Sequence, residues 1–468
     1  MGSKTLMILK AALASACLTL VVVPTASAAL TSSQKTAIQK VGSDAYVYGY
    51  APVYMQRNVA RFPANMVVNV QYLATELTRT VVKPNSDTLY SIAILDVGTD
   101  PVIVHAPSTG SRYFSFELLD GHTNVFGYIG TRATGTDGGD YAIVGPNWNS
   151  STTPLAKSVK AIYRSHTPRV WLVGRTLVDG DADLAAAVSV QGQITVQYNS
   201  KVLGAIYVPA FDLTVPNNAL GTPAVMVPNA AYFKEFGTVM AAQPPVAADS
   251  RLITAFAKYG VGPGLDPNKT QSAAVMAELV KGAKAGQAKI DAGMEAQRKA
   301  SEKKNNGWIL FDRVGDFGTD YLTRAIIAQI GVGANKPEEA IYPGTTHDYA
   351  GKILTGAANH VYKIHFNSGQ LPPVDGFWSI SMYAEDQYFI ANPINRFQIG
   401  DRTPNLVSNS DGSLDIWVSK AEPSAARGGV KNWLPAPAAN FTLVMRAYIP
   451  RPSILNGTWK YPKVTRVS

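Results

Sequence analysis

Short apolar runs separated by turn residues dominate this 468-residue chain and set the strongest limit on its fold. From Val67 onward, runs rich in Val, Ile, Tyr and Phe alternate with Gly, Pro, Asn and Asp. Such runs at roughly ten-residue spacing are typical of the strands of an antiparallel sandwich or barrel. In the N-terminal half they predict strands over 88–95, 102–105, 113–118, 125–129, 141–144, 161–163 and 170–173. Strands do not alternate with helices here, so a Rossmann-type sheet is not expected.

The middle of the chain has a different composition, rich in Ala, Lys, Glu, Gln and Met. This pattern predicts helices over 230–259, 271–304 and 320–330, in addition to one over 32–50. Pro267 stands where the longest of them would start. The β pattern then returns at 361–366, 378–383, 415–418 and 441–447, with an edge strand predicted over 459–462.

The sequence therefore predicts a mainly β protein with a helical segment: an N-terminal antiparallel β-sandwich plus a C-terminal jelly-roll-like β domain. Two or three domains are expected because one hydrophobic core rarely serves more than about 250–300 residues. The predicted boundaries are 1–28 for a signal peptide, 29–60 for a helical lead-in, 61–225 for the β-sandwich, 226–335 for the helical segment and 336–468 for the C-terminal domain.

The first 28 residues have the three parts of a secretory signal peptide. Positive charge at Lys4 and Lys10 is followed by an apolar stretch and by small residues that end at Ala28. We expect cleavage after Ala28 and a secreted or periplasmic location; an uncleaved anchor is the alternative. Cys17 is the only cysteine, so the mature chain is expected to lack disulfides, a Cys nucleophile and Cys-ligated metals.

The charge pattern gives only weak information on partners. The formal net charge of +9 becomes +7 without the two signal lysines, and charged residues make up only 16% of the chain. The densest basic run, 298–304, is interpreted as a solvated helix end, so no nucleic-acid partner is expected. The positive excess suits an anionic cell wall or polysaccharide. No stretch after the signal is long and apolar enough to span a membrane, and the sequence leaves the oligomeric state open.

Two sets of motifs resemble known families. The first set runs from Pro84-Asn85-Ser86-Asp87 through Arg112-Tyr113, Asp120 and Ile129-Gly130-Thr131-Arg132 to Gly145-Pro146. The second set runs from Gly376-Phe377-Trp378-Ser379 through Asn432-Trp433-Leu434-Pro435 to Gly457-Thr458-Trp459. In order and spacing they resemble the paired domain-of-unknown-function families 1254 (N-terminal) and 1214 (C-terminal). The resemblance implies a β-sandwich, a small helical region and a jelly roll, and supplies no mechanism.

Several kinds of catalytic site are not indicated. The histidines show no zinc-protease spacing and no compact cluster with carboxylates, so no metal is expected. The chain has no Gly-x-Ser-x-Gly elbow, although a Ser–His–Asp triad assembled by folding stays open. Its Gly-rich segments lack the context of a phosphate-binding loop, and no cofactor is expected.

Paired carboxylates remain as candidates for catalysis. Asp87 and Asp120 stand at predicted strand ends and could act as acid and base in glycoside cleavage. With Asn85 they could also bind Ca²⁺, or they could simply hold local turns. Arg132 lies in an otherwise uncharged stretch and needs a partner, which Asp120 or a substrate oxyanion would supply.

Aromatic residues with neighbouring amides suggest substrate contacts. Most of the Tyr and Trp side chains are expected to fill β cores, but Trp433 stands in a Pro-bounded loop and is predicted to be exposed. Together with Tyr90 it could stack on a sugar ring. Asn85, Asn124 and Arg132 would then supply hydrogen bonds to the ligand.

These residues lead to three hypotheses of function. The first is an exported protein that binds or processes a polar, hydroxyl-rich small molecule or glycan between the two β domains, in its enzyme version as a metal-independent hydrolase using Asp87 and Asp120. The second is a non-catalytic envelope or surface protein whose β domains are interaction modules. The third is a tailoring enzyme that holds an apolar metabolite with its aromatic residues. The lining of the pocket would separate the first from the third.

Overall fold

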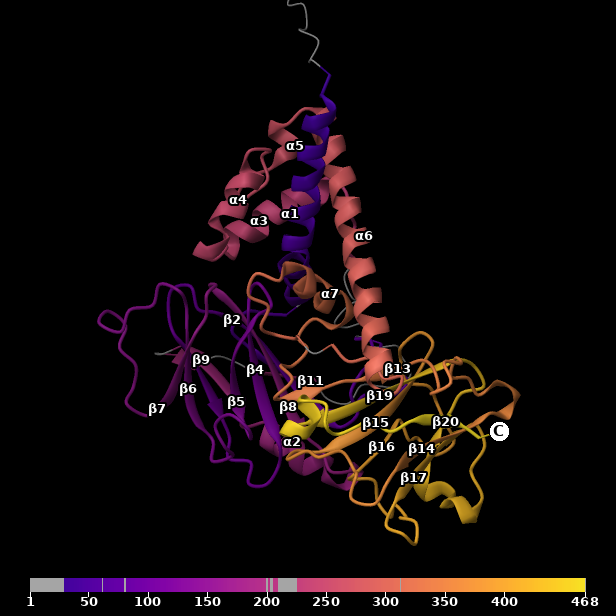
Figure 1. Ribbon diagram of the computed structural model, residues 1–468. Coiled ribbons are helices and arrows are strands. Elements are labelled where there is room, and N and C mark those ends of the chain that lie inside the picture. Colours follow the sequence, from indigo (N-terminus) through magenta and orange to yellow (C-terminus); the bar gives the residue numbers. More distant parts are fainter. Residues whose placement is uncertain are drawn as a thin grey trace, which may run out of the picture.

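A computed structural model of the protein describes residues 29–467, apart from 61, 80, 199–200, 203–204, 209–224 and 312. The predicted signal peptide and Cys17 lie outside the described residues. Figure 1 shows two β regions side by side, with a group of helices that rises above them. The architecture is mostly β with a helical segment, which confirms the fold class predicted from the sequence.

The N-terminal β region is a sandwich of two sheets, with strand orders β11-β1-β2-β8-β4-β5 and β10-β9-β3-β6-β7. The first sheet contains β11 (Ala205–Val208), β1 (Val67–Val70), β2 (Thr88–Asp96), β8 (Arg169–Leu177), β4 (Phe114–Asp120) and β5 (Val125–Gly130). The second sheet contains β10 (Lys201–Val202), β9 (Thr195–Tyr198), β3 (Val102–Ala106), β6 (Gly139–Val144) and β7 (Val159–Arg164). Each predicted strand overlaps one of β2 to β8. Alternate residues such as Leu95, Phe116 and Leu172 fill the core between the sheets, because successive side chains of a strand point to opposite faces.

The C-terminal β region also contains two sheets around one core. One sheet has β12 (Ala340–Ile341), β19 (Phe441–Tyr448), β15 (Trp378–Ala384) and β16 (Gln398–Gly400), with β13 (Gly344–Thr345) also paired to β19. The other has β18 (Trp433–Pro435), β17 (Leu414–Ser419), β14 (Val361–Phe366) and β20 (Val464–Arg466). The terminal edge strand is β20 and not the predicted 459–462, because Trp459 and Tyr461 pack into the core instead.

The helices form a third body with its own core. They are α1 (Ser32–Val59), α3 (Ala230–Ala242), α4 (Ser250–Ala257), α5 (Pro267–Thr270), α6 (Ala273–Lys304) and α7 (Tyr321–Gly331). Thr31 and Gln34 form a capping box at the start of α1, and Ser272 caps α6. The predicted helix over 230–259 is split by Pro244 and Pro245, which cannot donate helical hydrogen bonds.

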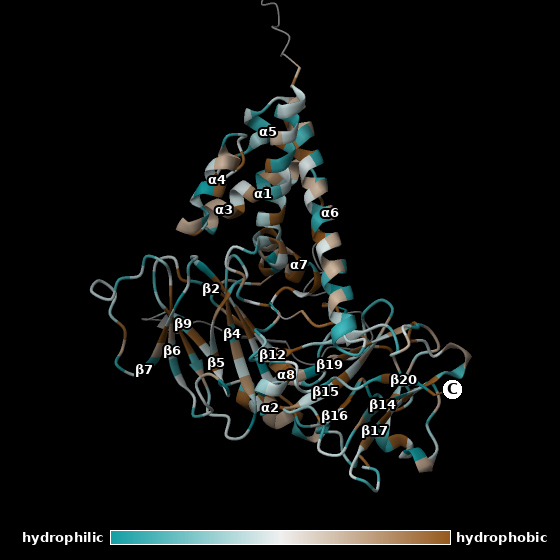
Figure 2. Cartoon of the chain, in the orientation of Figure 1, coloured by the Kyte–Doolittle hydropathy of each residue, from teal (hydrophilic) through white to brown (hydrophobic). Residues whose placement is uncertain are grey.

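Two short helices belong to the β regions: α2 (Leu184–Gln191) and α8 (Pro452–Leu455). In Figure 2 hydrophobic residues lie along the strands, while α6 alternates hydrophobic and hydrophilic positions. That alternation suits a helix with one packed face, and its buried residues Leu279, Ala283 and Ile290 join the helical core. Within the described residues, no helix combines the length and hydropathy that a membrane crossing requires.

Candidate functional site

A cavity of about 560 Å³ lies where the N-terminal sandwich, the helices and the C-terminal β region meet. One wall is the outer face of the larger sandwich sheet, with Tyr90 and Ile92 from β2 and Trp171, Val173 and Arg175 from β8. Strand alternation turns these side chains away from the sandwich core. One face of this sheet therefore packs against its partner sheet, and the other face lines the cavity.

The other walls come from distant parts of the chain. The end of α6 supplies Met294, α7 supplies Ile327, and the segment between them supplies Phe311. The C-terminal sheet adds Val444 and Arg446 of β19. More than half of the lining residues are aliphatic or aromatic, so the cavity suits an apolar ligand better than a hydroxyl-rich one.

Among the described lining residues, the charged groups of the cavity are all basic. Lys83, Arg175, Arg298 and Arg446 line it, and no Asp, Glu or His is among its described lining residues. Arg298 is neutralised at the cavity edge by Glu295 and Glu302 of the same helix. Of the remaining three, Arg175 is paired with Glu117, while Lys83 and Arg446 have no acidic partner among the described residues.

Arg175 is held by a buried network behind the cavity wall. Its Nη1 donates to Glu117 Oε2 at 3.0 Å and to Asn335 Oδ1 at 3.2 Å, while Nη2 donates to the Gly333 carbonyl at 3.2 Å. Burial raises the pKa of Glu117 to about 7, although Arg175 opposes the shift. Near neutral pH this carboxyl is therefore partly protonated.

Glu117→Gln is expected to gain stability over the wild type as the pH rises. Between about pH 4.5 and 7 folded Glu117 holds a proton that the unfolded chain has released, so the wild type loses roughly 3 kcal/mol over this window. Glutamine cannot titrate and avoids this loss. Urea unfolding at about pH 5 and pH 8 measures the difference.

Exposed Glu338 provides the control for this prediction, since Glu338→Gln should follow the wild-type pH profile. Parallel profiles for wild type and Glu117→Gln would mean that Glu117 titrates normally.

Arg446 differs from Arg175 because no carboxylate lies within ion-pair distance of it among the described residues. Its side chain is buried, and Nη2 donates to the Lys83 carbonyl at 2.9 Å and the Tyr383 hydroxyl at 2.6 Å. Its Nε is buried without any hydrogen-bond partner. Burying a guanidinium without a counter-charge costs folding free energy, and a bound anion would reduce that cost.

Tyrosine side chains connect the two guanidinium groups. Burial raises the pKa of Tyr342, and nearby Arg175 and Arg446 partly oppose this shift. The same two arginines oppose the raised pKa of buried Tyr448. Arg446 lies over the Tyr342 ring at 5.5 Å, and Asn335, which accepts a hydrogen bond from Arg175, donates to the Tyr342 hydroxyl at 2.5 Å. Both arginines are thus close to Tyr342, and we call this part of the cavity its basic end.

Comparisons with known proteins match the N-terminal and C-terminal β regions to two separate family models. Residues 64–198 match the family model "Protein of unknown function (DUF1254)", and residues 339–452 match "Protein of unknown function (DUF1214)". The chain carries a DUF1254 region followed by a DUF1214 region. The resemblance expected from the sequence motifs is thus confirmed at both ends, and the cavity lies between the two regions.

Two solved structures are similar to this chain. The crystal structure of the VPA0106 protein from Vibrio parahaemolyticus has a TM-score of 0.65 and 24% identity, covering 92% of this chain and 100% of that chain. An uncharacterized protein from Burkholderia cenocepacia has a TM-score of 0.43 and 13% identity, covering 92% of this chain and 95% of its own. No curated protein matches this chain. The first similarity shows the fold alone.

Two of the predicted site residues line the cavity, namely Asn85 and Tyr90 of the DUF1254 region. The Asn85 side-chain amide donates to the hydroxyls of Thr88 at 3.0 Å and Tyr448 at 2.9 Å. The Tyr90 ring faces the Arg175 guanidinium at 5.8 Å. Both residues therefore help to position groups at the basic end of the cavity.

Asp87 joins the two regions instead of facing the cavity. Its carboxylate is fully buried, accepts a hydrogen bond from Ser379 Oγ at 2.7 Å and pairs with Arg402 Nη2 at 2.5 Å. Both partners belong to the DUF1214 region. Every described contact of this side chain is thus part of the joint between the regions.

Asp120 lies far from Asp87. Asp87 precedes the start of β2, whereas Asp120 ends β4, and both strands pair antiparallel with β8 between them. Asp120 and Leu95 both pair with Val170 of β8, so Asp120 lies level with Leu95 across the sheet. Leu95 is eight residues beyond Asp87 along β2, and at ~3.3 Å per residue the two aspartates are roughly 25 Å apart along the strand direction. Asp120 instead accepts hydrogen bonds from the backbone of His122 and from Asn124, which closes their turn.

Two expectations about predicted contacts are wrong. Arg132 pairs with Glu339 of the DUF1214 region at 2.7 Å and not with Asp120. Trp433 is only 3% exposed, because it lies in β18 beside β17 and donates its Nε1–H to the Ser419 carbonyl at 2.9 Å. Neither residue lines the cavity, nor do Asp87, Asp120 and Asn124.

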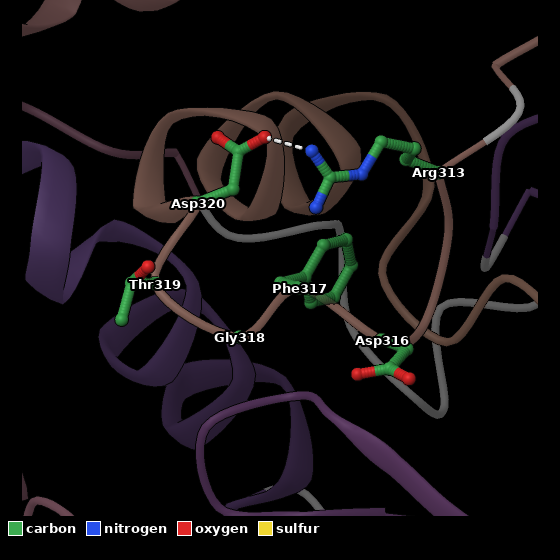
Figure 3. Close-up of a pocket in the computed structure, with 6 residues that line it drawn as sticks. All are labelled: Arg313, Asp316, Phe317, Gly318, Thr319 and Asp320. Atoms are coloured by element: carbon green, nitrogen blue, oxygen red, sulfur yellow. Dashed lines mark hydrogen bonds and ion pairs between the residues drawn. The ribbon is translucent and has the colours of Figure 1, made fainter. Parts of the chain in front are cut away.

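A second hollow opens on the surface beside α7, formed by residues 313–320 (Figure 3). Its main charges are already paired: Arg313 binds Asp320 at 3.0 Å, and Asp320 also caps the helix. Asp316 approaches Lys336 at 4.0 Å. Since a single loop builds it and its main charges are paired, this hollow is a weaker candidate than the cavity. Elsewhere in the described chain, no group of three or more His, Cys, Asp or Glu residues could hold a metal ion.

Proposed function

We propose that this protein binds a small, largely apolar molecule in the cavity between the DUF1254 and DUF1214 regions. The observation that carries the proposal is the lining, with aliphatic and aromatic side chains from both regions and from α6 and α7. Its volume of about 560 Å³ falls in the usual range for ligand pockets. Polar side chains make up about a third of the described lining, and Lys83, Arg175 and Arg446 are among them.

The lining favours the apolar ligand of our third hypothesis over a glycan. The glycan hypothesis depended on Asp87, Asp120 and Trp433, which have other partners. An apolar ligand suits a binding protein as well as a tailoring enzyme, and the proposal includes both. Export of the mature chain is part of the proposal, and the pattern of residues 1–28 supports it.

The neutral fluorescent dye N-phenyl-1-naphthylamine tests this proposal, because its emission rises when it enters an apolar site. The wild type is expected to bind it saturably, with one dye per chain. Ile92 lines the cavity and is partly accessible, so Ile92→Trp fills the space and should weaken binding roughly tenfold or more. Fluorescence titration gives the dissociation constant of the dye for the wild type and for the variant.

Val407→Trp is the matched control, since Val407 is 42% exposed and does not line the cavity. This variant should bind the dye like the wild type. Equal affinity in Ile92→Trp and the wild type, or no saturable binding at all, would show that the cavity is not a site for apolar ligands.

A further inference from the structure

We infer that the ligand of this cavity carries an anionic head group and that Arg446 binds it, an inference that rests on the proposed function. The first support is the one-sided charge of the lining: four basic residues and, among the described lining residues, no acidic one. In a space of low dielectric such an imbalance is costly until an anion enters.

Elimination leaves Arg446 and Lys83, and of these two only Arg446 is buried, so we take Arg446 as the main receptor for the anion. Arg298 is occupied by Glu295 and Glu302, and Arg175 by Glu117 and the neighbouring acceptors on Asn335 and Gly333. Arg446 has no acidic partner among the described residues. Its side chain is 94% buried, since only 6% is exposed.

The hydrogen bonds of Arg446 fix the position of the guanidinium but use only some of its N–H donors. Nη2 reaches the Lys83 and Pro84 carbonyls and the Tyr383 hydroxyl, which fixes the orientation of the group. Nε has no partner, and Nη1 donates no hydrogen bond to any described residue. A positioned guanidinium with a free N–H is the group that proteins use to bind carboxylates.

Lys83 supports the same location for the head group. Burial by surrounding protein lowers the pKa of its ammonium group, and the nearby charge of Arg446 lowers it further. The side chain is nevertheless accessible, because it faces the space of the cavity. An anion between Lys83 and Arg446 would relieve this repulsion.

The remaining walls determine the rest of the molecule. Met294, Phe311 and Ile327, from the helical side, offer apolar surface, and the one charged group of α6 in the described lining, Arg298, is paired with Glu295 and Glu302. A ligand with its charge at Arg446 would place its body against these residues. The class we infer is therefore an amphiphilic carboxylate, with an aliphatic or aromatic body and a single acidic end.

Decanoate and 1-decanol test the inference, because they share a chain and differ in the head group. Each is titrated against wild-type protein loaded with N-phenyl-1-naphthylamine, and dye displacement is measured. Decanoate is expected to compete roughly tenfold or more better than the alcohol, as a charge-assisted hydrogen bond predicts. Equal competition would overturn the inference, while the dye binding itself would still support an apolar site.

Arg446→Gln assigns the head group to this residue. In the folded variant decanoate should compete no better than 1-decanol, and this ratio is measured within one protein, so it does not depend on the affinity of the variant for the dye. Arg451→Gln is the matched control, because Arg451 is exposed and pairs with exposed Asp375. Arg446→Lys keeps the charge and serves if Arg446→Gln does not fold; it should retain part of the preference. Full preference in a folded Arg446→Gln variant would show that the anion binds elsewhere.

Discussion

Asp87→Ala is expected to lower the free energy of unfolding by about 3–5 kcal/mol. Asp87 is fully buried and is the partner of Arg402, whose Nε already lacks a hydrogen-bond partner. The substitution leaves that guanidinium beside the Phe377 ring, at 4.3 Å, with only the partly exposed Asp401 carboxylate, 3.7 Å from Nε, as a counter-charge. It also removes the acceptor of the Ser379 hydroxyl. Urea unfolding of both proteins measures the loss.

Asp386→Ala is the matched control for this prediction. Asp386 is half-exposed and pairs with Arg79 on the surface, where such pairs contribute less than about 1 kcal/mol. The comparison also tests the catalytic role first suggested for Asp87. If Asp87→Ala were as stable as the control, the joint between the two regions would not depend on this carboxylate, and a functional role would return.

The β framework could be predicted from the sequence because its signal is local. Short apolar runs between turn residues mark β2 to β8 and β14, β15, β17 and β19. The helix α2 gave no such signal, since its residues Leu184–Gln191 are mostly apolar and small and show no polar face. The break after α3 was signalled by Pro244 and Pro245, which our helix prediction over 230–259 passed over.

The carboxylate pair shows what local patterns cannot supply. Asp87 and Asp120 both border strands, and proximity would require their strands to end at the same edge of the sheet. The pairing of β2 and β4 with a shared neighbour, β8, makes them run in the same direction. The start of one and the end of the other then lie at opposite edges. Strand order and direction come from long-range pairing, which the residues near either aspartate do not reveal.

The basic end of the cavity could have been found by an argument already applied to Arg132. A charged residue inside an apolar strand must face a partner or a ligand. Arg175 in Val-Gly-Arg-Thr-Leu and Arg446 in Val-Met-Arg-Ala-Tyr stand in such settings. Sequence alone does not tell which of these arginines has a counter-charge. Only the fold shows that Arg132 and Arg175 are paired and that Arg446 is not.

Gly282→Ala is expected to destabilise the protein by about 4 kcal/mol, above the usual range for overpacking. Gly282 of α6 packs against α1, and a Cβ there would lie 2.2 Å from the Gln39 carbonyl oxygen and 2.9 Å from the Gly42 Cα. Both are backbone atoms, so one helix must move away from the other and loosen the helical core. The gain in helix propensity, about 1 kcal/mol, is too small to compensate. Urea unfolding again gives the difference.

Gly293→Ala in the same helix separates close packing from helix propensity. Its Cβ would be too close only to the Ile326 Cδ1 atom at 2.9 Å, the end of a flexible side chain that can shift, and would make an ordinary contact with Leu322 at 3.5 Å. Propensity should then dominate, and this variant should match the wild type or exceed it by up to about 1 kcal/mol. The two alanine variants should therefore change stability in opposite directions. If both were neutral or stabilising, α1 and α6 would not be in backbone contact at Gly282, and the described helix packing would be wrong.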